Sequence, residues 1–260
     1  MAPIALTIAG SDPSGGAGIQ ADLKTFHQFG VYGEAVITLV TVQNTVRVSR
    51  VEVLAPELVA EQIAAVLEDI PPRAAKTGAL GSAEMVQTVA RLAAEFAFPL
   101  VVDPVMVSKH GLPLVDDTAL AAIRDLLIPR AALITPNIPE AEALTGAAVR
   151  TLDDMRRAAR CLHSLGARAV LIKGGHSEGP PTDLLFDGSA FHEFAKERIA
   201  TVHTHGTGCT YSAAITAGLA TGEPVAQAVA RAKQFIHEAI RTNPALGHGC
   251  GPVNHHARVT

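Results

Sequence analysis

The stretch IALTIAGSDPSGGAG at residues 4–18 predicts the fold of this chain, because an apolar run passes directly into a glycine-rich turn. Residues 4–9 form the apolar run and predict a buried strand. Residues 10–18 hold four glycines and three small polar residues, and a helical pattern follows them. Glycines let backbone N–H groups approach a ligand closely, and the start of a helix favours negative charge. The alternative is an ordinary strand-to-helix turn in which Ser14 is the N-cap.

The alternation of short apolar runs with helical segments continues along the chain. Further strands are predicted at 35–42, 74–76, 100–103, 133–135 and 169–173. Between them lie segments in which apolar residues have helical spacing. A hairpin is predicted within 183–194 around Asp187-Gly188, and two Ala-rich helices are predicted at 208–222 and 225–241. This order predicts an α/β fold with a mainly parallel central sheet and helices on both faces, a Rossmann-like three-layer sandwich.

The composition indicates a protein of the cell interior. With 260 residues, 48% hydrophobic and 18% charged, the chain fits one large domain, residues 1–260. A net charge of -4 shows no excess of basic residues of the kind that binds nucleic acid or an anionic membrane. No apolar run approaches the ~20 residues of a membrane span, and the first residues show no signal peptide. Three widely spaced cysteines, Cys161, Cys209 and Cys250, favour a reducing compartment. We therefore expect a cytoplasmic protein without nucleic-acid or membrane partners.

Polar or glycine-rich segments follow six of the predicted strands. They are residues 10–18, 43–44, 77–78, 103–104, 136–137 and 173–175. In an open parallel sheet the carboxyl ends of the strands border one crevice, and ligands bind there. The sequence therefore predicts a ligand site at this rim of the sheet.

Residues 135–140 read TPNIPE, and two interpretations of them are open. Asn137 as N-cap, Pro139 in the first turn and Glu140 three residues after the cap form a capping box. Alternatively, oxygen atoms of Asn137 and Glu140 lie close to Asp103 and hold Mg²⁺ through water beside nucleotide phosphates. On the motif alone, capping is the stronger interpretation.

Residues 205–210 read HGTGCT and open one of the predicted Ala-rich helices. Consecutive N–H groups at a helix start bind anions, and here they suit a transferring phosphoryl group. Cys209 lies in the first turn, where the helix dipole favours its thiolate. The alternative for Cys209 is a small buried apolar residue, as most unpaired cysteines are. Lys173, followed by two glycines, either directs an ammonium group at phosphates or simply ends a strand.

Taken together, these segments resemble the hydroxymethylpyrimidine/phosphomethylpyrimidine kinases of the ribokinase-like superfamily. The resemblance spans nearly the whole chain and rests on eight segments in order. They are AGSDPSGGAGIQADLKTF at 9–26, VQNT at 42–45, KTGAL at 76–80, DPVMVSKHG at 103–111, LITPNIPEAEAL at 133–144, LIKGGH at 171–176, HGTGCTYSAA at 205–214 and GHGCGP at 247–252.

The resemblance implies a ribokinase-like fold, a homodimer and a kinase of thiamine diphosphate biosynthesis. Such enzymes use ATP to phosphorylate the hydroxymethyl group of 4-amino-5-hydroxymethyl-2-methylpyrimidine, and then phosphorylate the monophosphate to the diphosphate. In that family the glutamine of the QNT segment, here Gln43, hydrogen-bonds the aminopyrimidine. The aspartate of the QAD segment, here Asp22, lies beside the hydroxymethyl group. Backbone near Gly10 and Val105 completes the substrate pocket.

The resemblance also implies a catalytic role for the HGTGCT segment. Many ribokinase-like sugar kinases carry an aspartate base where the pyrimidine kinases carry a cysteine, here Cys209. We therefore expect Cys209 to accept the hydroxyl proton as the oxygen attacks the γ-phosphorus. The N–H groups of Gly206, Thr207, Gly208 and Cys209 are expected to stabilise the developing charge.

The nucleotide phosphates form the other half of the expected site. Lys173 and Gly208 are expected to contact ATP, and Lys173 also to assist the transfer. Mg²⁺ is expected around Asp103, Asn137 and Glu140, where it would neutralise phosphate charge together with Lys173.

Two other functions remain open on the sequence. One is a pyridoxal/pyridoxine kinase, because some relatives with this cysteine accept such substrates; Gln43 within QNT favours the pyrimidine. The other is a non-catalytic pyrimidine-binding sensor. A sensor needs none of the phosphoryl-transfer residues, which are all present: Asp103, Glu140, Lys173 and Cys209.

Overall fold

The computed structural model describes residues 2–108, 111–176 and 180–258. Within them a nine-stranded sheet runs in the order β3-β2-β1-β4-β5-β6-β7-β8-β9. The strands from β2 to β7 in this order are parallel, and β3, β8 and β9 extend the two edges antiparallel. The strands are β1 (Ile4–Ser11), β2 (Tyr32–Gln43), β3 (Val48–Val53), β4 (Ala74–Thr77), β5 (Leu100–Val102), β6 (Leu133–Ile134), β7 (Val170–Ile172), β8 (Thr182–Phe186) and β9 (Phe191–Ala195).

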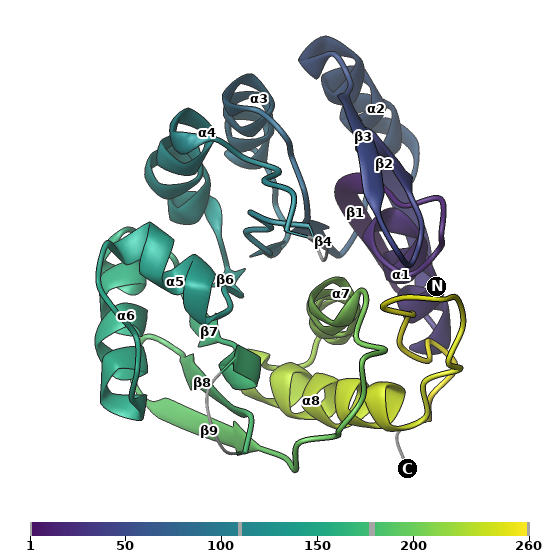
Figure 1. Cartoon of the computed structure of the whole chain (residues 1–260). Coiled ribbons are helices and arrows are strands. Elements are labelled where there is room, and N and C mark those ends of the chain that lie inside the picture. Colours follow the sequence, from purple (N-terminus) through teal and green to yellow (C-terminus); the bar gives the residue numbers. More distant parts are fainter. Residues whose placement is uncertain (1, 109–110, 177–179, 259–260) are drawn as a thin grey trace.

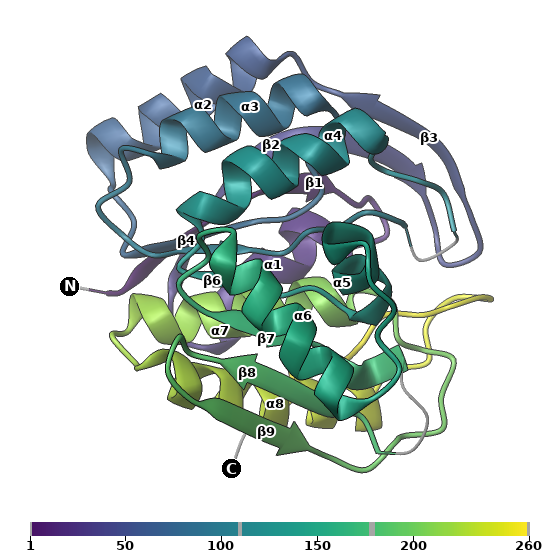
Figure 2. The ribbon, with the colours of Figure 1, turned by 90° about the vertical axis from the view of Figure 1, so that its left-hand side faces the viewer.

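Helices cover both faces of this curved sheet (Figure 1). One face carries α1 (Gly18–Gln28), α7 (Thr207–Ala220) and α8 (Val225–Arg241). The other carries α2 (Pro56–Asp69), α3 (Ala83–Ala93), α4 (Asp117–Ala122), α5 (Ile138–Thr145) and α6 (Leu152–Ser164). After α4 the chain continues through a π-helical turn, Ile123–Leu127, and a 3-10 turn, Ile128–Arg130; another 3-10 turn is Gly174–His176. Figure 2 shows the hairpin of β8 and β9 at the far edge from β3.

The two faces of β1 pack against side chains of different size. Leu6 and Ile8 of β1 pack with residues of α2 and α3 in the larger core. On the opposite face Ala5 packs with Ala213 and Ala217 of α7. A helix with apolar residues all round is a buried helix, and α7 is buried on nearly every side. Small residues therefore allow α7 to lie close to the sheet and to bring its start to the rim where the parallel strands end.

Most of the predicted elements are confirmed. All six predicted strands of the parallel core, the hairpin and both Ala-rich helices are present within a few residues of their expected bounds. The strand β3 was not predicted; it pairs antiparallel with β2 beyond a turn in which Asn44 Oδ1 accepts the N–H groups of Val46 and Arg47. The expectation of Ser14 as N-cap is wrong, because α1 begins later and its N-cap is Ala17.

No helix in the described part of the chain is long and apolar enough to span a membrane.

A buried ion pair ties α1 to the sheet. Lys76 of β4 donates to Asp22 Oδ2 of α1 at 2.8 Å, and both side chains are 0% exposed. Thr7 of β1 donates to the same carboxylate oxygen at 2.6 Å. Desolvation lowers the pKa of Lys76, but the negative charge of Asp22 and other nearby groups outweighs it and raises that pKa. Burial also raises the pKa of Asp22, and Lys76 opposes that rise, so each partner depends on the other.

We expect Lys76→Ala to lower the free energy of unfolding by about 3–5 kcal/mol, because it leaves Asp22 charged or protonated without its partner in the core. Urea unfolding followed by circular dichroism measures this. Arg50→Ala is the control, since it breaks the exposed Arg50–Glu52 pair and should cost less than about 1 kcal/mol. Equal costs for the two variants would show that the buried pair does not stabilise the fold.

Candidate active site

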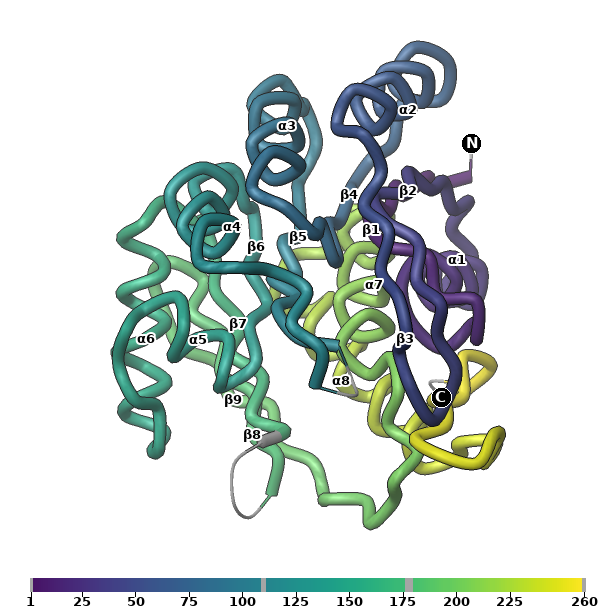
Figure 3. The backbone as a smooth tube through the Cα atoms, turned by 45° about the horizontal axis from the view of Figure 1, so that its top comes forward, coloured from purple at the N-terminus to yellow at the C-terminus, as the bar shows by residue number. Residues whose placement is uncertain are grey.

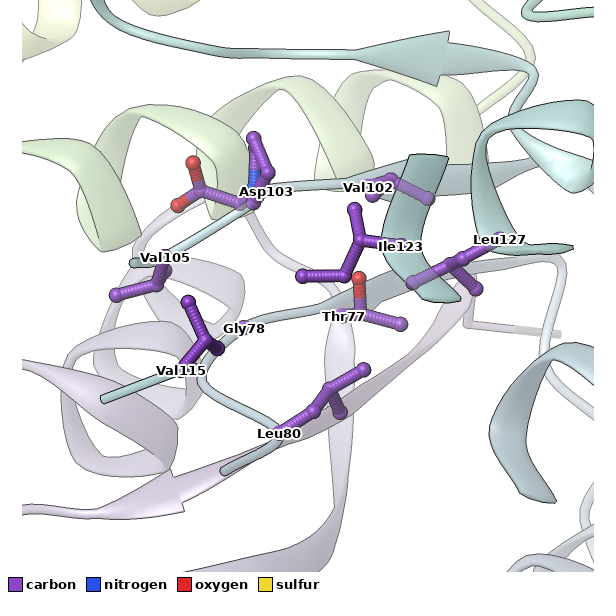
Figure 4. Close-up of a pocket in the computed structure, with 10 residues that line it drawn as sticks. Thr77, Gly78, Leu80, Val102, Asp103, Val105, Val115, Ile123 and Leu127 are labelled. Carbon is purple, nitrogen blue, oxygen red and sulfur yellow. The ribbon is translucent and has the colours of Figure 1, made fainter. Parts of the chain in front are cut away.

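The carboxyl ends of β5 and β7 meet the start of α7 at one rim of the sheet. Figure 3 shows α7 beside the middle strands of the sheet. Asp103 directly follows β5, and its carboxylate points away from Ile123 and Leu127 in the small pocket of Figure 4. Lys173 directly follows β7, and Asn137 pairs with it beside the end of β6. The predicted gathering of polar segments at this rim is confirmed.

Asp103 and Lys173 form the central ion pair of the rim. Their atoms Oδ1 and Nζ are 2.9 Å apart. Thr135 donates to the same oxygen at 3.2 Å, and Ser212 of α7 donates to Oδ2 at 3.1 Å. Burial raises the pKa of Asp103, but the charges of Lys173 and Lys76 outweigh it and hold that pKa below its ordinary value. The site therefore holds a fixed carboxylate and a fixed ammonium group.

Gly208, at the start of α7, lies against this pair. A Cβ added to it would stand 3.5 Å from Lys173 Nζ and 3.8 Å from Asp103 Oδ2. The absence of a side chain leaves Lys173 accessible from the start of α7. The first N–H groups of a helix have no partner within the helix, so Lys173 and the α7 start present positive charge to the same point.

Glu140 and Asn137 form the capping box expected at the start of α5. Asn137 Oδ1 accepts the Glu140 N–H at 2.9 Å, and Glu140 Oε2 accepts the Asn137 N–H at 2.8 Å. Burial raises the pKa of Glu140 to about 7; Lys173 opposes this rise and Asp103 adds to it. Capping is therefore confirmed, while the metal role of these residues stays a prediction. Among the described residues, no three His, Cys, Asp or Glu side chains are grouped to hold a metal directly.

Cys209 lies in the first turn of α7, after the left-handed N-cap Gly206 at φ 76°. The expectation of a favoured thiolate is wrong for the free protein. Desolvation raises the pKa of the Cys209 thiol to about 12; Lys76 opposes this, and Asp22 and Asp103 add to it. Burial among carboxylates thus outweighs the helix dipole, and Cys209 rests as a thiol. Whether it acts as a base stays a prediction.

The glycine-rich loop is held by a carboxylate of its own chain. Asp12 accepts the N–H groups of Ser14, Gly16 and Ala17 at 2.9–3.2 Å. Burial raises the pKa of Asp12, but hydrogen bonds from His205 and Ser14 outweigh it and lower that pKa. Asp12 therefore occupies these three N–H groups, and a ligand role for the rest of the segment stays a prediction.

The four residues expected at the substrate lie in different surroundings. Gln43 is half-buried and lies 3.3 Å from His205, measured between their Nε2 atoms. Asp22 is buried with Lys76, and its Oδ1 has no hydrogen-bond partner in the described residues. Gly10 leaves no room for a side chain, since a Cβ would stand 2.5 Å from Leu39. Val105 is half-buried beside Asp103, whose carbonyl accepts its N–H at 2.9 Å.

Sequence reasoning missed three charged or polar contributors to this site: Asp12, Lys76 and His205. Lys76 carried a visible signal, because a lysine within the otherwise apolar strand Ala74–Thr77 needs a buried partner. Asp12 and His205 lay within recognised segments, but 193 residues separate them, and only the fold brings them together.

A model of the phosphomethylpyrimidine kinase family matches residues 12–254. The chain belongs to that family. The hydroxymethylpyrimidine/phosphomethylpyrimidine kinase of Bacillus subtilis is 50% identical over 97% of this chain and 94% of its own length. A thiamine biosynthesis bifunctional protein of Geobacter sulfurreducens is 53% identical over 96% of this chain, which spans about half (51%) of that protein.

Solved structures agree with the ribokinase-like α/β fold. An ADP complex of Bacillus subtilis pyridoxal kinase superposes with a TM-score of 0.91 at 39% identity, covering 99% of this chain and 98% of the other. A phosphomethylpyrimidine kinase of Clostridium difficile gives a TM-score of 0.82 at 46% identity, covering 91% and 99%. The expected fold class and family are therefore confirmed.

We expect Glu140→Gln to stabilise the ligand-free protein at pH 8 but not at pH 5. The folded-state pKa of Glu140, about 7, exceeds its ordinary value of 4.5, so ionisation costs stability as pH rises through this window. Glutamine keeps the acceptor of the capping box without the charge. The gain at pH 8 should be about 1–3 kcal/mol by urea unfolding. Glu84→Gln on the exposed side of α3 is the control, and its effect should differ little between the two pH values. A pH-independent loss of stability in Glu140→Gln would contradict this account.

Proposed function

We propose that this chain transfers the γ-phosphoryl group of ATP to the hydroxymethyl oxygen of 4-amino-5-hydroxymethyl-2-methylpyrimidine, and then phosphorylates the monophosphate to the diphosphate in thiamine diphosphate biosynthesis. The observation that carries the proposal is the meeting of the α7 start, Cys209 included, with the Asp103–Lys173 pair in a member of this family. Relatives at 50% and 49% identity, named as hydroxymethylpyrimidine/phosphomethylpyrimidine kinases, support the substrate class.

The nucleotide phosphates are proposed to lie between Lys173 and the N–H groups of Gly206, Thr207 and Gly208. The Thr207 N–H donates to Thr204 O at 3.3 Å in the ligand-free protein and would exchange this acceptor for a phosphate oxygen. A fixed ammonium group and the start of a helix both favour phosphoryl oxygens, and they act most strongly on charge that develops during transfer. Because Asp103 already holds the Lys173 side chain in place, this side chain loses little conformational entropy when the nucleotide binds.

Magnesium is proposed to bind beside the same phosphates. The donors present are oxygen atoms, as Mg²⁺ prefers, and Mg²⁺ usually keeps several waters and one or two carboxylates. Lys173 is already paired with Asp103 and is also the cation that acts on Glu140, so an added cation near them would balance the second carboxylate. Asp103 and Glu140 would hold the ion through water, with Asn137 keeping Glu140 in place. When bound, Mg²⁺ neutralises phosphate charge.

Cys209 is proposed as the general base. Its thiolate would accept the proton of the hydroxymethyl group while that oxygen attacks the γ-phosphorus and ADP leaves. The free thiol must first lose its own proton to solvent water, and the ammonium of Lys76 is the nearby charge that favours this loss. On the substrate side we propose Gln43 at the aminopyrimidine and Asp22 beside the hydroxymethyl group. Backbone at Gly10 and Val105 would complete the pocket.

A homodimer in the cytoplasm is proposed, without nucleic-acid or membrane partners. The exposed side chains of Val40 and Val42 on β2, at 42% and 54% exposure, supply an apolar surface beside β3 that a second copy would cover. Sedimentation equilibrium measures the mass, and a monomer at micromolar concentration would refute the dimer.

A pyridoxal kinase is the second candidate, because a solved pyridoxal kinase shares the fold at a TM-score of 0.91. Mass spectrometry of products formed from ATP, Mg²⁺ and either the hydroxymethylpyrimidine or pyridoxal separates the two. We expect the mono- and diphosphate of the pyrimidine to form, with slower or no turnover of pyridoxal. Preferred turnover of pyridoxal would select the alternative, and no turnover of either would indicate a sensor.

We expect Cys209→Ala to lower kcat by roughly 10²–10⁴, the usual worth of positioned proton transfer, while the KM values change little. Wild-type kcat should rise with pH above 7, because the thiolate fraction grows towards the raised pKa of about 12; the variant should lose this rise. Cys161→Ala is the control, since Cys161 is exposed on α6. Near-normal kcat in folded Cys209→Ala would mean that another group takes the proton.

A further inference from the structure

His205 connects three parts of the site through a buried side chain. Its Nε2 lies 2.7 Å from Asp12 Oδ2, and the two residues are each 3% exposed. The same Nε2 lies 3.3 Å from Gln43 Nε2. His205 therefore stands between the carboxylate that holds the glycine-rich loop and the amide proposed to read the substrate ring.

The short contact with Asp12 fixes a proton on His205 Nε2. A carboxylate accepts hydrogen bonds and, when ionised, donates none, and Asp12 is already the acceptor for several N–H groups of its loop. His205 Nε2 must therefore donate. Its Nδ1 is buried without a hydrogen-bond partner in the described residues, so Nε2 makes the polar contacts of the ring.

A protonated Nε2 determines which end of the Gln43 amide faces the imidazole. The amide nitrogen is also a donor, and two N–H groups that face each other form no hydrogen bond. Turning the amide by half a rotation brings Oε1 to the Nε2–H, which Asp12 and Gln43 then share as acceptors, and the hydrogen-bond network decides such orientations. The Gln43 NH₂ group then points away from His205 and is available to a ligand.

The surroundings of His205 leave it little freedom to move. Its backbone N–H donates to Gly251 O at 3.0 Å, and its ring packs so closely on Gly16 that a Cβ there would stand 2.4 Å away. The segment around Gly251 that binds the His205 backbone also contacts the turn after Gln43. There the backbone N–H of Cys250 donates to Thr45 O at 2.8 Å. Gln43 is thus fixed at its side chain and at its turn.

We propose that His205, held by Asp12, is a positioning residue that determines substrate specificity by making Gln43 present its NH₂ donor to the ligand. The matching ligand carries an unprotonated ring nitrogen as hydrogen-bond acceptor at that point, as an aminopyrimidine does beside its amino group. This inference rests on the proposed function for its ligand class. A ligand with C–H in place of that nitrogen would leave the NH₂ group unpaired.

The test compares two ligands by isothermal titration calorimetry. They are 4-amino-5-hydroxymethyl-2-methylpyrimidine and 4-amino-5-hydroxymethyl-2-methylpyridine, which has C–H at the ring position beside the amino group. We expect His205→Leu to reduce the preference for the pyrimidine, expressed as the ratio of the two Kd values, by about tenfold relative to wild type. In a Gln43→Leu background, His205→Leu should change the ratio no further. Asp12→Asn should lower the ratio in the same direction and serves where His205→Leu does not fold.

His255→Leu is the matched control. His255 is also buried in the C-terminal segment, but its Nε2 bonds Thr210 Oγ1 at 3.1 Å, and it should leave the ratio unchanged. Equal weakening of both ligands in folded His205→Leu or Asp12→Asn would overturn the proposal, because a merely structural role predicts that result. Binding without phosphoryl transfer would refute the proposed function and leave the ratio as the test of this inference. Wild-type protein that binds neither ligand would overturn both.

Discussion

The balance of buried charge beneath the start of α7 is the constraint on which the site depends. Two ion pairs, Asp22–Lys76 at 2.8 Å and Asp103–Lys173 at 2.9 Å, leave this layer neutral. Glu140 and Cys209 are additional acidic groups without a cation of their own, and their pKa values rise to about 7 and about 12. Added positive charge would therefore favour the binding of further negative charge, such as that of nucleotide phosphates. The proposed function assigns this positive charge to Mg²⁺.

The position of this charged layer follows from the small residues of the neighbouring elements. The alanines of α7 let that helix lie against β1 and β4, and Gly206 allows its start to touch the glycine-rich loop, since a Cβ there would stand 1.7 Å from Gly16 O. Larger residues at these contacts would move Cys209 away from Lys76. The packing of small residues on one face of the sheet therefore determines the distances between the charged groups at its rim.

The sequence predicts the parallel core well because its strands are apolar runs with polar ends, as Leu100–Val102 before Asp103 illustrates. It does not predict β3, because none of its residues is buried and its pairing depends on β2. For the site, local signals locate Cys209 and the capping box at Asn137. The charge state of Cys209 could not be predicted, because it depends on the burial of the thiol and on residues far away in the sequence, such as Lys76.

The hold of Asp12 on the glycine-rich loop has a consequence for the thermodynamics of binding. In many phosphate-binding loops the anion itself orders the backbone, so part of the binding energy is lost to conformational entropy. Here a covalently attached carboxylate takes the place of that anion, and the N–H groups of Ser14, Gly16 and Ala17 are satisfied before any ligand arrives. The conformational entropy of the loop is therefore lost when the chain folds, and not when a ligand binds. The loop is thus preorganised by folding, and these three N–H groups need no bound anion to be satisfied.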